Sequence, residues 1–198
     1  SEMRATGSHW TFAPNIDLAR DARWGRVGET FGEDTYLVGE MGVAMVRGLQ
    51  QGDFSSRNAV VANAKHWVAG GEPLTGINLS PMDVSIRTLY EDFFPPFKKA
   101  IDAGVFTFMA AHNEINGEPA HGSHFLLTEV LRDNWKFEGF VVSDWMDVSR
   151  LHTFHKVAKT PEDAVFQTVD AGMDMNMHGP DFGPHLINLV KNLSLIHI

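Results

Sequence analysis

The chain has 198 residues, of which 43% are hydrophobic and 11% aromatic, so it can bury a substantial core. Its net charge of −9 argues against a nucleic-acid partner, which would require a basic face, and suits an uncharged small-molecule substrate. The absence of Cys excludes a disulfide framework and a thiolate zinc site, and no apolar run approaches the ~18 residues of a membrane-spanning helix. No signal peptide is visible, and the first residues read as mid-domain sequence.

In the first half of the chain, apolar segments that end in polar residues alternate with helical patterns. Three such segments, apolar and rich in β-branched residues, are expected to form strands: 10–17, 59–67 and 105–113. A helix is predicted over 35–50, where apolar residues recur at helical spacing behind acids that favour a helix N-terminus. A second helix is predicted from an N-cap at Ser85 to Ile101, with a break near Pro95 and Pro96.

The same alternation continues in the second half. Two further strands are expected over 139–144 and 172–177. An apolar stripe predicts a helix over 125–135, a start at Thr160-Pro161 predicts a helix over 160–170, and a start at Pro184 predicts a helix over 184–192.

This alternation predicts βαβ units and a parallel sheet, and the uniformly apolar strands indicate a sheet covered on both faces. No G-x-G-x-x-G follows the first strand, so a dinucleotide-binding fold is not supported. Every strand ends in polar groups, which we expect to share one rim, as in a (β/α)8 barrel. These groups are Asp17, Lys65, His66, His112, Asn113, Asp144, Asp174 and Asn176.

A complete barrel takes ~250 residues, more than this chain has. The sequence therefore predicts an α/β fold, a partial (β/α)8 TIM-type barrel over 1–192, truncated at both ends. The segment 193–198 ends in mid-helix without a cap, and it matches what a common sequencing-adapter sequence encodes in frame. We expect this tail to be non-native.

The stretch Gly139-Phe-Val-Val-Ser-Asp-Trp145 places a lone carboxylate, Asp144, at the end of a buried strand. A buried carboxylate is costly without a partner, and active sites lie at the carboxyl ends of parallel strands. Asp144 is therefore a candidate nucleophile, general base or metal ligand, although an Asp that caps the following segment fits the spacing equally well. Trp145 offers an apolar wall for a sugar ring, or a core side chain.

Lys65 and His66 are adjacent at a strand end, where a regular strand would point them to opposite faces. In a site they would hydrogen-bond neighbouring hydroxyls of a polyol; otherwise the Lys pairs with a local acid and the His is satisfied in the core. The Gly-rich loop 18–34 holds three Arg residues and several acids, most of which we expect to pair with one another. One Arg facing Asp144 would keep that carboxylate ionised.

A metal site is an alternative reading of the many His residues, because imidazoles and carboxylates bind zinc. The candidates are His66, His112, His121, His124, His152, His155 and His178. No H-x-H strand or H-E-x-x-H helix is present, so we assign no metal ligands and expect no cofactor.

Five motifs occur in a consistent order: Phe12–Asp17, Arg20–Asp34, Ala64–Trp67, Asn113–Gly117 and Gly139–Trp145. Together they resemble glycoside hydrolase family 3, which includes β-glucosidases, β-xylosidases and related exo-acting enzymes. The resemblance is specific for the family and much less so for the substrate. It implies a barrel domain followed by an α/β sandwich domain.

The resemblance implies a retaining exo-acting β-glycosidase in which Asp144 is the catalytic nucleophile. The residues expected to contact substrate are Arg26, Lys65, His66, His112 and Trp145. His112 stands where many relatives place Tyr, and the loop 70–78 lacks an Arg that many relatives carry there. The resemblance therefore does not assign the residues of the outer part of the sugar site. The His-containing loop of the N-acetylhexosaminidase branch is absent, which disfavours that branch.

The expected substrate is a small oligosaccharide or an aryl or alkyl β-glycoside, cleaved through a covalent glycosyl-Asp144 intermediate. The acid/base Glu is expected from a second domain missing from this chain, as is an early sugar-binding Asp, so we expect the fragment alone to be nearly inactive. Relatives of this type are often exported to the periplasm or the cell exterior. A metal-dependent barrel hydrolase and a catalytically inactive sugar-binding fragment remain the alternatives.

Overall fold

The computed structural model describes residues 2–52, 54–180, 182–192 and 194–195. Its central layer is a parallel sheet in the order β1–β2–β5. The strands are β1 (Asn63–Trp67), β2 (Thr107–Ala110) and β5 (Phe140–Val142). Isolated parallel bridges add an extended segment at each edge, Asn15 beside Lys65 and Met175 beside Val142. Neighbouring segments thus follow chain order, as in part of a (β/α)8 barrel wall.

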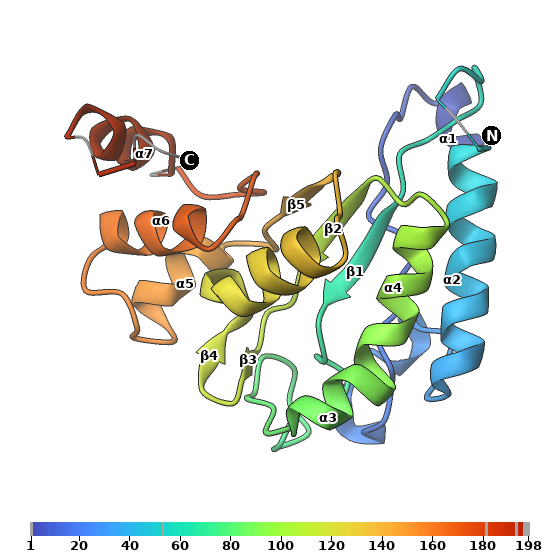
Figure 1. The fold of residues 1–198 in the computed structure, drawn as a ribbon, viewed down its shortest axis with the longest axis horizontal. Helices are drawn as coiled ribbons and strands as arrows, with labels where there is room; N and C mark the ends of the chain where they lie inside the picture. The colour runs from blue at the N-terminus through green and yellow to red at the C-terminus, as the bar shows by residue number, and fades with distance from the viewer. Residues whose placement is uncertain (1, 53, 181, 193, 196–198) are drawn as a thin grey trace.

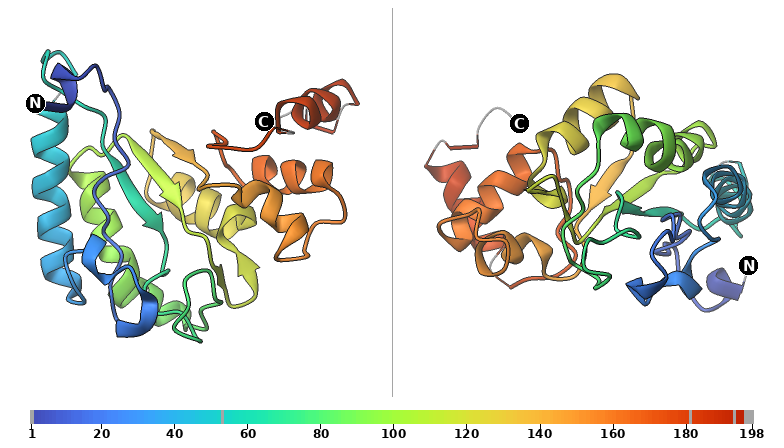
Figure 2. Two further views of the ribbon diagram at one scale, coloured as in Figure 1. Left: turned by 180° about the vertical axis from the view of Figure 1, so that it is seen from behind. Right: turned by 90° about the horizontal axis from the view of Figure 1, so that it is seen from below.

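Helices connect these strands and cover the sheet (Figures 1 and 2). The α-helices are α1 (Glu2–Ala5), α2 (Thr35–Gln50), α3 (Ile86–Thr88), α4 (Phe94–Asp102), α5 (Asp147–Thr153), α6 (Pro161–Asp170) and α7 (Phe182–Lys191). The π-helical segments are η3 (Leu89–Phe93) and η5 (Phe125–Asn134), and the 3-10 turns are η1 (Ala22–Trp24), η2 (Val27–Glu29) and η4 (Ala120–Gly122). A short antiparallel hairpin comprises β3 (Glu114–Ile115) and β4 (Glu118–Pro119).

Two groups of helices lie toward opposite ends of the sheet in Figure 1. Helices α2 and α4 pack together at one end, whereas α5, α6 and α7 pack together at the other. Helices α1 and α7 consequently lie far apart (Figures 1 and 2). None of the described helices is both long and apolar enough to cross a membrane.

The main core lies where the sheet meets α4 and η5. Trp67 stacks on Phe94 at 5.0 Å between ring centroids and contacts Trp135 edge-on at 5.3 Å. Phe108 of β2 lies 5.8 Å from the ring of Phe97 in α4. Every residue of β2 is buried, so the predicted coverage of both sheet faces is confirmed.

Several predicted helix starts are confirmed because their signals are local. The carboxylate of Asp34 accepts a hydrogen bond from the backbone N–H of Leu37 at 2.7 Å, and α2 runs over the predicted 35–50. Ser85 caps α3 through the N–H of Thr88, and the hydroxyl of Thr160 caps α6.

The predicted interruption of the helix near Pro95 and Pro96 is present as a π-helical segment, η3, that ends just before them; both prolines occupy the first turn of α4, where a missing N–H costs little. Other predictions of secondary structure are wrong. The segments 10–17 and 172–177 form isolated bridges instead of strands. Helix α5 and the β3–β4 hairpin were not predicted. Of the predicted tail at 193–198, only 194–195 are described; the rest of that prediction lies outside the described residues.

The close approach of Gly139 to the neighbouring strand yields a stability prediction. A Cβ at this position would lie 2.1 Å from the backbone oxygen of Phe106, which accepts the N–H of Phe140. We expect Gly139→Ala to lower the free energy of unfolding by about 3 kcal/mol, because backbone must move to relieve the overlap. Denaturant titration measures the change.

Gly48→Ala is the matched control, since Gly48 lies on α2 with nothing within 4 Å of an added Cβ. Alanine is the better helix former by about 1 kcal/mol, so this variant should be as stable as the parent or more so. Equal stability of the two variants would contradict the account of β5 packing.

Candidate active site

Polar side chains from four neighbouring segments meet at the carboxyl edge of the sheet. Asp17 ends the first extended segment, His66 lies in β1, His112 follows β2 and Asp144 follows β5. Two imidazole nitrogens approach the same carboxylate oxygen: His112 Nε2 lies 3.0 Å and His66 Nε2 lies 3.5 Å from Asp144 Oδ2. These predicted rim residues therefore form one cluster, as expected for strands that end at one edge.

His66 is held on both sides by charged partners. Its Nδ1 lies 2.6 Å from Oδ2 of the buried Asp17, and its Nε2 lies 3.1 Å from Nη2 of Arg26. Because a guanidinium only donates, Nε2 accepts, which places the ring proton on Nδ1 facing Asp17. His66 is therefore a neutral imidazole, and its approach to Asp144 is a contact without a hydrogen bond.

The Arg26 side chain is aimed at this cluster by Glu29. Two parallel hydrogen bonds of 2.8 Å join its Nε and Nη2 to the Glu29 carboxylate. The bonds from Arg26 lower the pKa of Glu29 to about 2, and the charge of Lys65 acts in the same direction. The pairing of β1 with β2 shifts register between Lys65 and Trp67, so β1 is irregular at His66.

His112 is clamped between two carboxylates. Its Nδ1 lies 2.6 Å from Oδ2 of Asp147, the first residue of α5, and its Nε2 faces Asp144. Asp147 is buried and also accepts a hydrogen bond from Arg150. Burial acts to raise the pKa of Asp147, but the interactions with His121, His112 and Arg150 outweigh it and the pKa is lowered. Asp147 is therefore an ionised, buried carboxylate.

A second buried imidazole fixes the backbone at Asp144. The N–H of Asp144 donates to His121 Nε2 at 2.9 Å, which requires that nitrogen to be unprotonated. Burial lowers the pKa of His121 and outweighs the nearby carboxylates Asp147 and Asp144, which act to raise it. His121 is accordingly neutral, and it orients the chain at the end of β5.

The Asp144 carboxylate keeps one partly accessible edge. Its side chain is 11% exposed, and Oδ1 accepts the N–H of Trp145 at 2.6 Å while Oδ2 faces the two imidazoles. A carboxylate held by a backbone donor on one oxygen and open on the other side is suited to attack an electrophile or to accept a proton.

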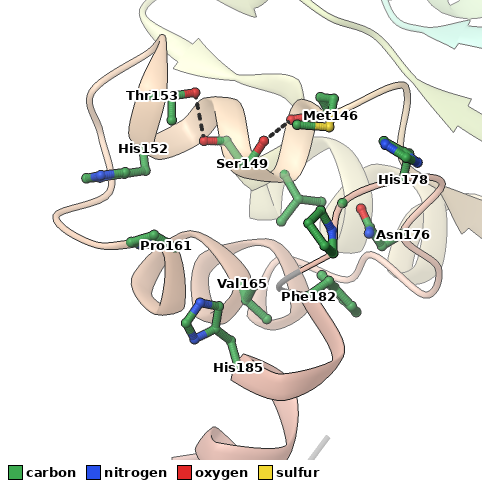
Figure 3. A pocket seen from close by; sticks show the side chains of 13 residues that line it. Met146, Ser149, His152, Thr153, Pro161, Val165, Asn176, His178, Phe182 and His185 are labelled. Atoms are coloured by element: carbon green, nitrogen blue, oxygen red, sulfur yellow. Dashed lines mark hydrogen bonds between the residues drawn. The ribbon is translucent and has the colours of Figure 1, made fainter.

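Trp145 forms part of the rim and remains half exposed, with 54% of its surface accessible. One face of its indole stacks on His178, with 4.0 Å between ring centroids and 3° between planes. Figure 3 shows His178 beside a largely apolar cavity of about 290 Å³ that is also lined by residues of α5, α6 and α7. Because one face of the Trp145 indole packs on His178 and part of the ring stays exposed, this side chain is suited to stack against a flat apolar surface of a ligand.

Two buried oxygens near His66 accept no hydrogen bond from the residues that the structure describes. They are Oδ1 of Asp17 and Oδ1 of Asn113. Gly70 lies between them: a Cβ there would be 3.3 Å from Asn113 Oδ1 and 3.9 Å from Asp17 Oδ1. A side chain at Gly70 would therefore crowd both acceptors.

Asp174 does not belong to this rim, contrary to the prediction. Its Oδ2 accepts the N–H of Val141 at 2.7 Å and pairs with Arg132, at the opposite end of β5. The remaining candidates have other partners: Arg20 with Asp92, Arg23 with Asp21, His124 with Glu129, His152 with the carbonyl of Ala158, and His155 with Glu114.

The metal alternative gains one geometric observation. Within the described part of the chain, His112, Asp144 and Asp147 offer ligand atoms that all lie within 4.8 Å of one another. The close contact of His112 Nδ1 with Asp147 explains part of this clustering, because a nitrogen that donates a proton cannot also ligate.

Sequence reasoning missed Asp147 and did not identify the roles of Glu29 and His121 in the cluster. Glu29 lies within the Arg20–Asp34 motif and His121 was only one of several metal candidates, and nothing in their spacing reveals which side chain or backbone group each one meets. Asp147 had only one signal, its place three residues after Asp144. Its partner His112 is 35 positions away, so the contact depends on the tertiary fold.

The chain is similar to known proteins over nearly its whole length. The family model described as Glycosyl hydrolase family 3 N terminal domain matches residues 1–197. The chain is 45% identical over 181 residues to a β-xylosidase from Formosa agariphila and 41% identical over 191 residues to the periplasmic β-glucosidase of Salmonella typhimurium. These matches cover 89% and 96% of this chain, and it spans 25% of the length of each relative.

The chain is also similar to solved structures of glycosidases. A β-glucosidase from Erythrobacter marinus superposes with a TM-score of 0.93 at 39% identity, covering 99% of this chain and 26% of that one. The β-glucosidase from Listeria innocua in complex with glucose superposes with a TM-score of 0.93 at 36% identity, covering 97% and 27%. A GH3 exo-β-xylosidase in complex with a xylobiose aziridine activity-based probe has a TM-score of 0.84 at 29% identity, covering 95% and 25%.

The neutral state of His121 predicts a specific pH dependence of stability. Because burial lowers its pKa in the folded protein, the unfolded chain binds a proton more readily, so acid favours unfolding as the pH falls below ~6.5. His121→Gln keeps an acceptor for the N–H of Asp144 and removes the titrating ring. We expect its unfolding free energy to fall less steeply between about pH 7 and 5 than that of the parent.

The control is His124→Gln, which removes an exposed imidazole. Chemical denaturation at a series of pH values measures all three proteins. If His121→Gln shows the same pH slope as the parent and as His124→Gln, the assignment of His121 as a buried neutral acceptor fails.

Proposed function

The chain belongs to glycoside hydrolase family 3, and from this premise we propose that it is the nucleophile-bearing part of a retaining, exo-acting β-glycosidase. The observation that carries the proposal is the placement of Asp144, with Oδ1 held by a backbone N–H and Oδ2 faced by two imidazoles at the open rim. This arrangement supports attack on a sugar carbon, which needs an ionised and oriented carboxylate.

In the proposed reaction, an oxygen of Asp144 forms a bond to the anomeric carbon while the bond to the leaving oxygen breaks. The transition state has oxocarbenium character, and the leaving oxygen takes a proton from a second carboxylic acid. Water then attacks the anomeric carbon, the second carboxylate takes the proton from that water, and the ester bond to Asp144 breaks. Two inversions retain the β configuration.

The second carboxylic acid is proposed to come from outside these 198 residues. A general acid must be protonated and accessible to the leaving group. Asp17 and Asp147 lie nearest to the cluster, but both are buried against imidazoles, and the pKa of Asp147 is lowered. Glu72 and Glu114 already pair with Arg20 and His155 respectively. The chain spans about a quarter of its relatives' length, which leaves room for a second domain that supplies the acid.

The groups around Asp144 suit a neutral polyol. Arg26, which lies near Asp144, provides donors, and Lys65 lies near its partner Glu29. Asp17 Oδ1 and Asn113 Oδ1 are acceptors without a donor among the described residues. A sugar hydroxyl both donates and accepts, so a ring of hydroxyls can satisfy this mixed set. The names of the relatives favour a terminal β-linked glucose or xylose, and Trp145 would face the next sugar or an aryl aglycone.

The second candidate function is a metal-dependent hydrolase, favoured only by the grouping of His112, Asp144 and Asp147. Two carboxylates and an imidazole are an acceptable ligand set for zinc. It would compete directly with the glycosidase proposal, because an ion bound to Asp144 occupies the oxygen needed for attack.

Removal of the proposed nucleophile tests the first candidate. In the complete protein, Asp144→Asn should lower kcat for an aryl β-glucoside or β-xyloside by about 10³-fold or more, the scale for losing a member of a catalytic unit. Asp174→Asn, at the other end of β5, is the control and should keep near-parental kcat per folded molecule. Parental cleavage by Asp144→Asn would overturn the assignment.

Chelation separates the two candidates. Prolonged dialysis against EDTA should leave aryl β-glycoside cleavage by the complete protein unchanged, because the proposed chemistry uses only carboxylates. Elemental analysis of the same sample records any bound ion. Loss of activity on dialysis that added Zn²⁺ restores would instead favour the metal-dependent hydrolase.

A further inference from the structure

Glu29 is a solvent-accessible carboxylate that the proposed reaction does not use. Its side chain is 45% exposed, and it lies in the short turn η2, three residues after Arg26. Both of its oxygens bind the Arg26 guanidinium, Oε1 to Nε and Oε2 to Nη2, each at 2.8 Å. Ion pairs that water reaches usually add little to stability, so the simplest role of this pair is to order the loop 18–34. Its effect on Arg26 indicates a further role.

The bonds to Glu29 decide which donors of Arg26 remain available. A guanidinium carries five N–H groups in one plane, and Glu29 takes two of them on the edge formed by Nε and Nη2. The other N–H of Nη2 is directed at His66, whose Nε2 lies 3.1 Å away. None of the described residues accepts a hydrogen bond from Nη1 of Arg26. The two N–H groups of Nη1 are therefore available to a ligand.

Arg26 lies at the cluster that holds the proposed nucleophile. The charges of Asp17 and Asp144 both act on its guanidinium, and it lines a small cavity of about 10 Å³ together with His66 and Asn113. A cavity of this volume has room for about one water molecule or hydroxyl group. Asn113 is 3% exposed, and its Oδ1 accepts no hydrogen bond from the described residues. A free donor and a free acceptor beside one cavity suit hydroxyl groups, which accept from one and donate to the other.

The Glu29 carboxylate is itself held from a second side. Asn15, which is 7% exposed, donates from Nδ2 to Glu29 Oε2 at 3.4 Å. The Oδ1 of the same amide accepts the backbone N–H of Asp17 at 3.0 Å. The ring of the buried Trp24 lies 5.7 Å from the Arg26 guanidinium carbon. Arg26 is thus fixed by an indole face and by a carboxylate that the first extended segment holds in place.

We propose that Glu29 is a positioning residue that binds the Nε–Nη2 edge of Arg26, so that Nη1 presents its N–H groups to a hydroxyl of the sugar at Asp144. This inference rests on the proposed function and adds a residue that sets specificity in the same site. Arg has a long side chain with much rotational freedom. Loss of the carboxylate would let the guanidinium turn, and the donor would leave its place beside the sugar.

Substrates that each lack one ring hydroxyl test the proposal. The complete protein is assayed with an aryl β-glycoside of the sugar that it cleaves best and with the corresponding set of monodeoxy glycosides. Arg26→Lys keeps the charge but loses the planar guanidinium, so the ratio of kcat/KM between the full and the deoxy substrate should shrink for the hydroxyl that Arg26 binds. This variant identifies that hydroxyl.

Glu29→Gln should lower kcat/KM for the full substrate by about 10- to 100-fold, because a misplacement of about 1 Å can cost ~100-fold. The ratio between full and deoxy substrates should shrink at the hydroxyl that Arg26→Lys identifies and at no other. The denaturation midpoint should stay parental, since the pair is exposed. Glu29→Asp keeps the charge but shortens the reach, and should shrink the same ratio. Glu33→Gln, an exposed carboxylate of the same loop, is the control and should match the parent.

Three outcomes would overturn the proposal. The first is a parental rate for Glu29→Gln with every substrate. The second is a loss by the same factor for every substrate, as a purely structural residue would cause. The third is a change of ratio at a hydroxyl other than the one that Arg26→Lys identifies.

The first two outcomes do not depend on Arg26→Lys, and Glu29→Asp decides among all three if Glu29→Gln does not fold. Failure of the glycosidase proposal is distinguished beforehand, because the parent protein would then not cleave the full substrate or Asp144→Asn would cleave it normally.

Discussion

The site depends on keeping the Asp144 carboxylate ionised although it is largely buried. The residue as a whole is 8% exposed, and a buried carboxylate stays ionised only if hydrogen-bond donors replace the water it has lost. The backbone N–H of Trp145 donates a hydrogen bond to Oδ1 of Asp144, and His112 faces Oδ2. The imidazoles on either side are themselves held by buried carboxylates, Asp17 for His66 and Asp147 for His112. Each polar side chain is thus oriented by a neighbour, as a site with fixed geometry requires.

Parallel strands make this arrangement possible. Neighbouring segments in chain order end at one edge, so residues far apart in sequence deliver their side chains to one cluster. Helix α4 and the segment η5 pack apolar side chains against these strands, among them Phe94 and Phe97 against Trp67. Within the described cluster, Asp144 is the carboxylate that we propose as the nucleophile, and Asp17 and Asp147 beside it contact imidazoles. The proposed reaction needs a second, protonated carboxyl group, which we propose lies in another part of the protein.

Part of the fold could be predicted from short-range signals in the sequence. The start of α2 follows from a side-chain cap at Asp34, and that of α6 from a cap at Thr160 followed by Pro161. The strands β2 and β5 are apolar apart from Thr107, and the polar residues that follow them indicated the rim. Helix α5 could not be found this way, because its sequence mixes polar and apolar residues without a clear stripe. Asp174 resembled a rim residue in sequence, but its carboxylate binds the backbone at the start of β5. The sequence indicated that polar residues at strand ends would surround Asp144, whereas the contact between Asp147 and His112 could be found only from the three-dimensional structure.

The central claim is that Asp144 forms a covalent bond to the sugar. The most direct measurement is trapping in the complete protein with slow-reacting fluorinated gluco, xylo and galacto glycosides, followed by intact mass and peptide sequencing. The account predicts a mass increase of one fluorosugar per molecule, located on the peptide that contains Asp144, with at least one of the three sugars. An active enzyme that turns over these probes without an adduct, or that carries the adduct on another residue such as Asp147, would contradict it.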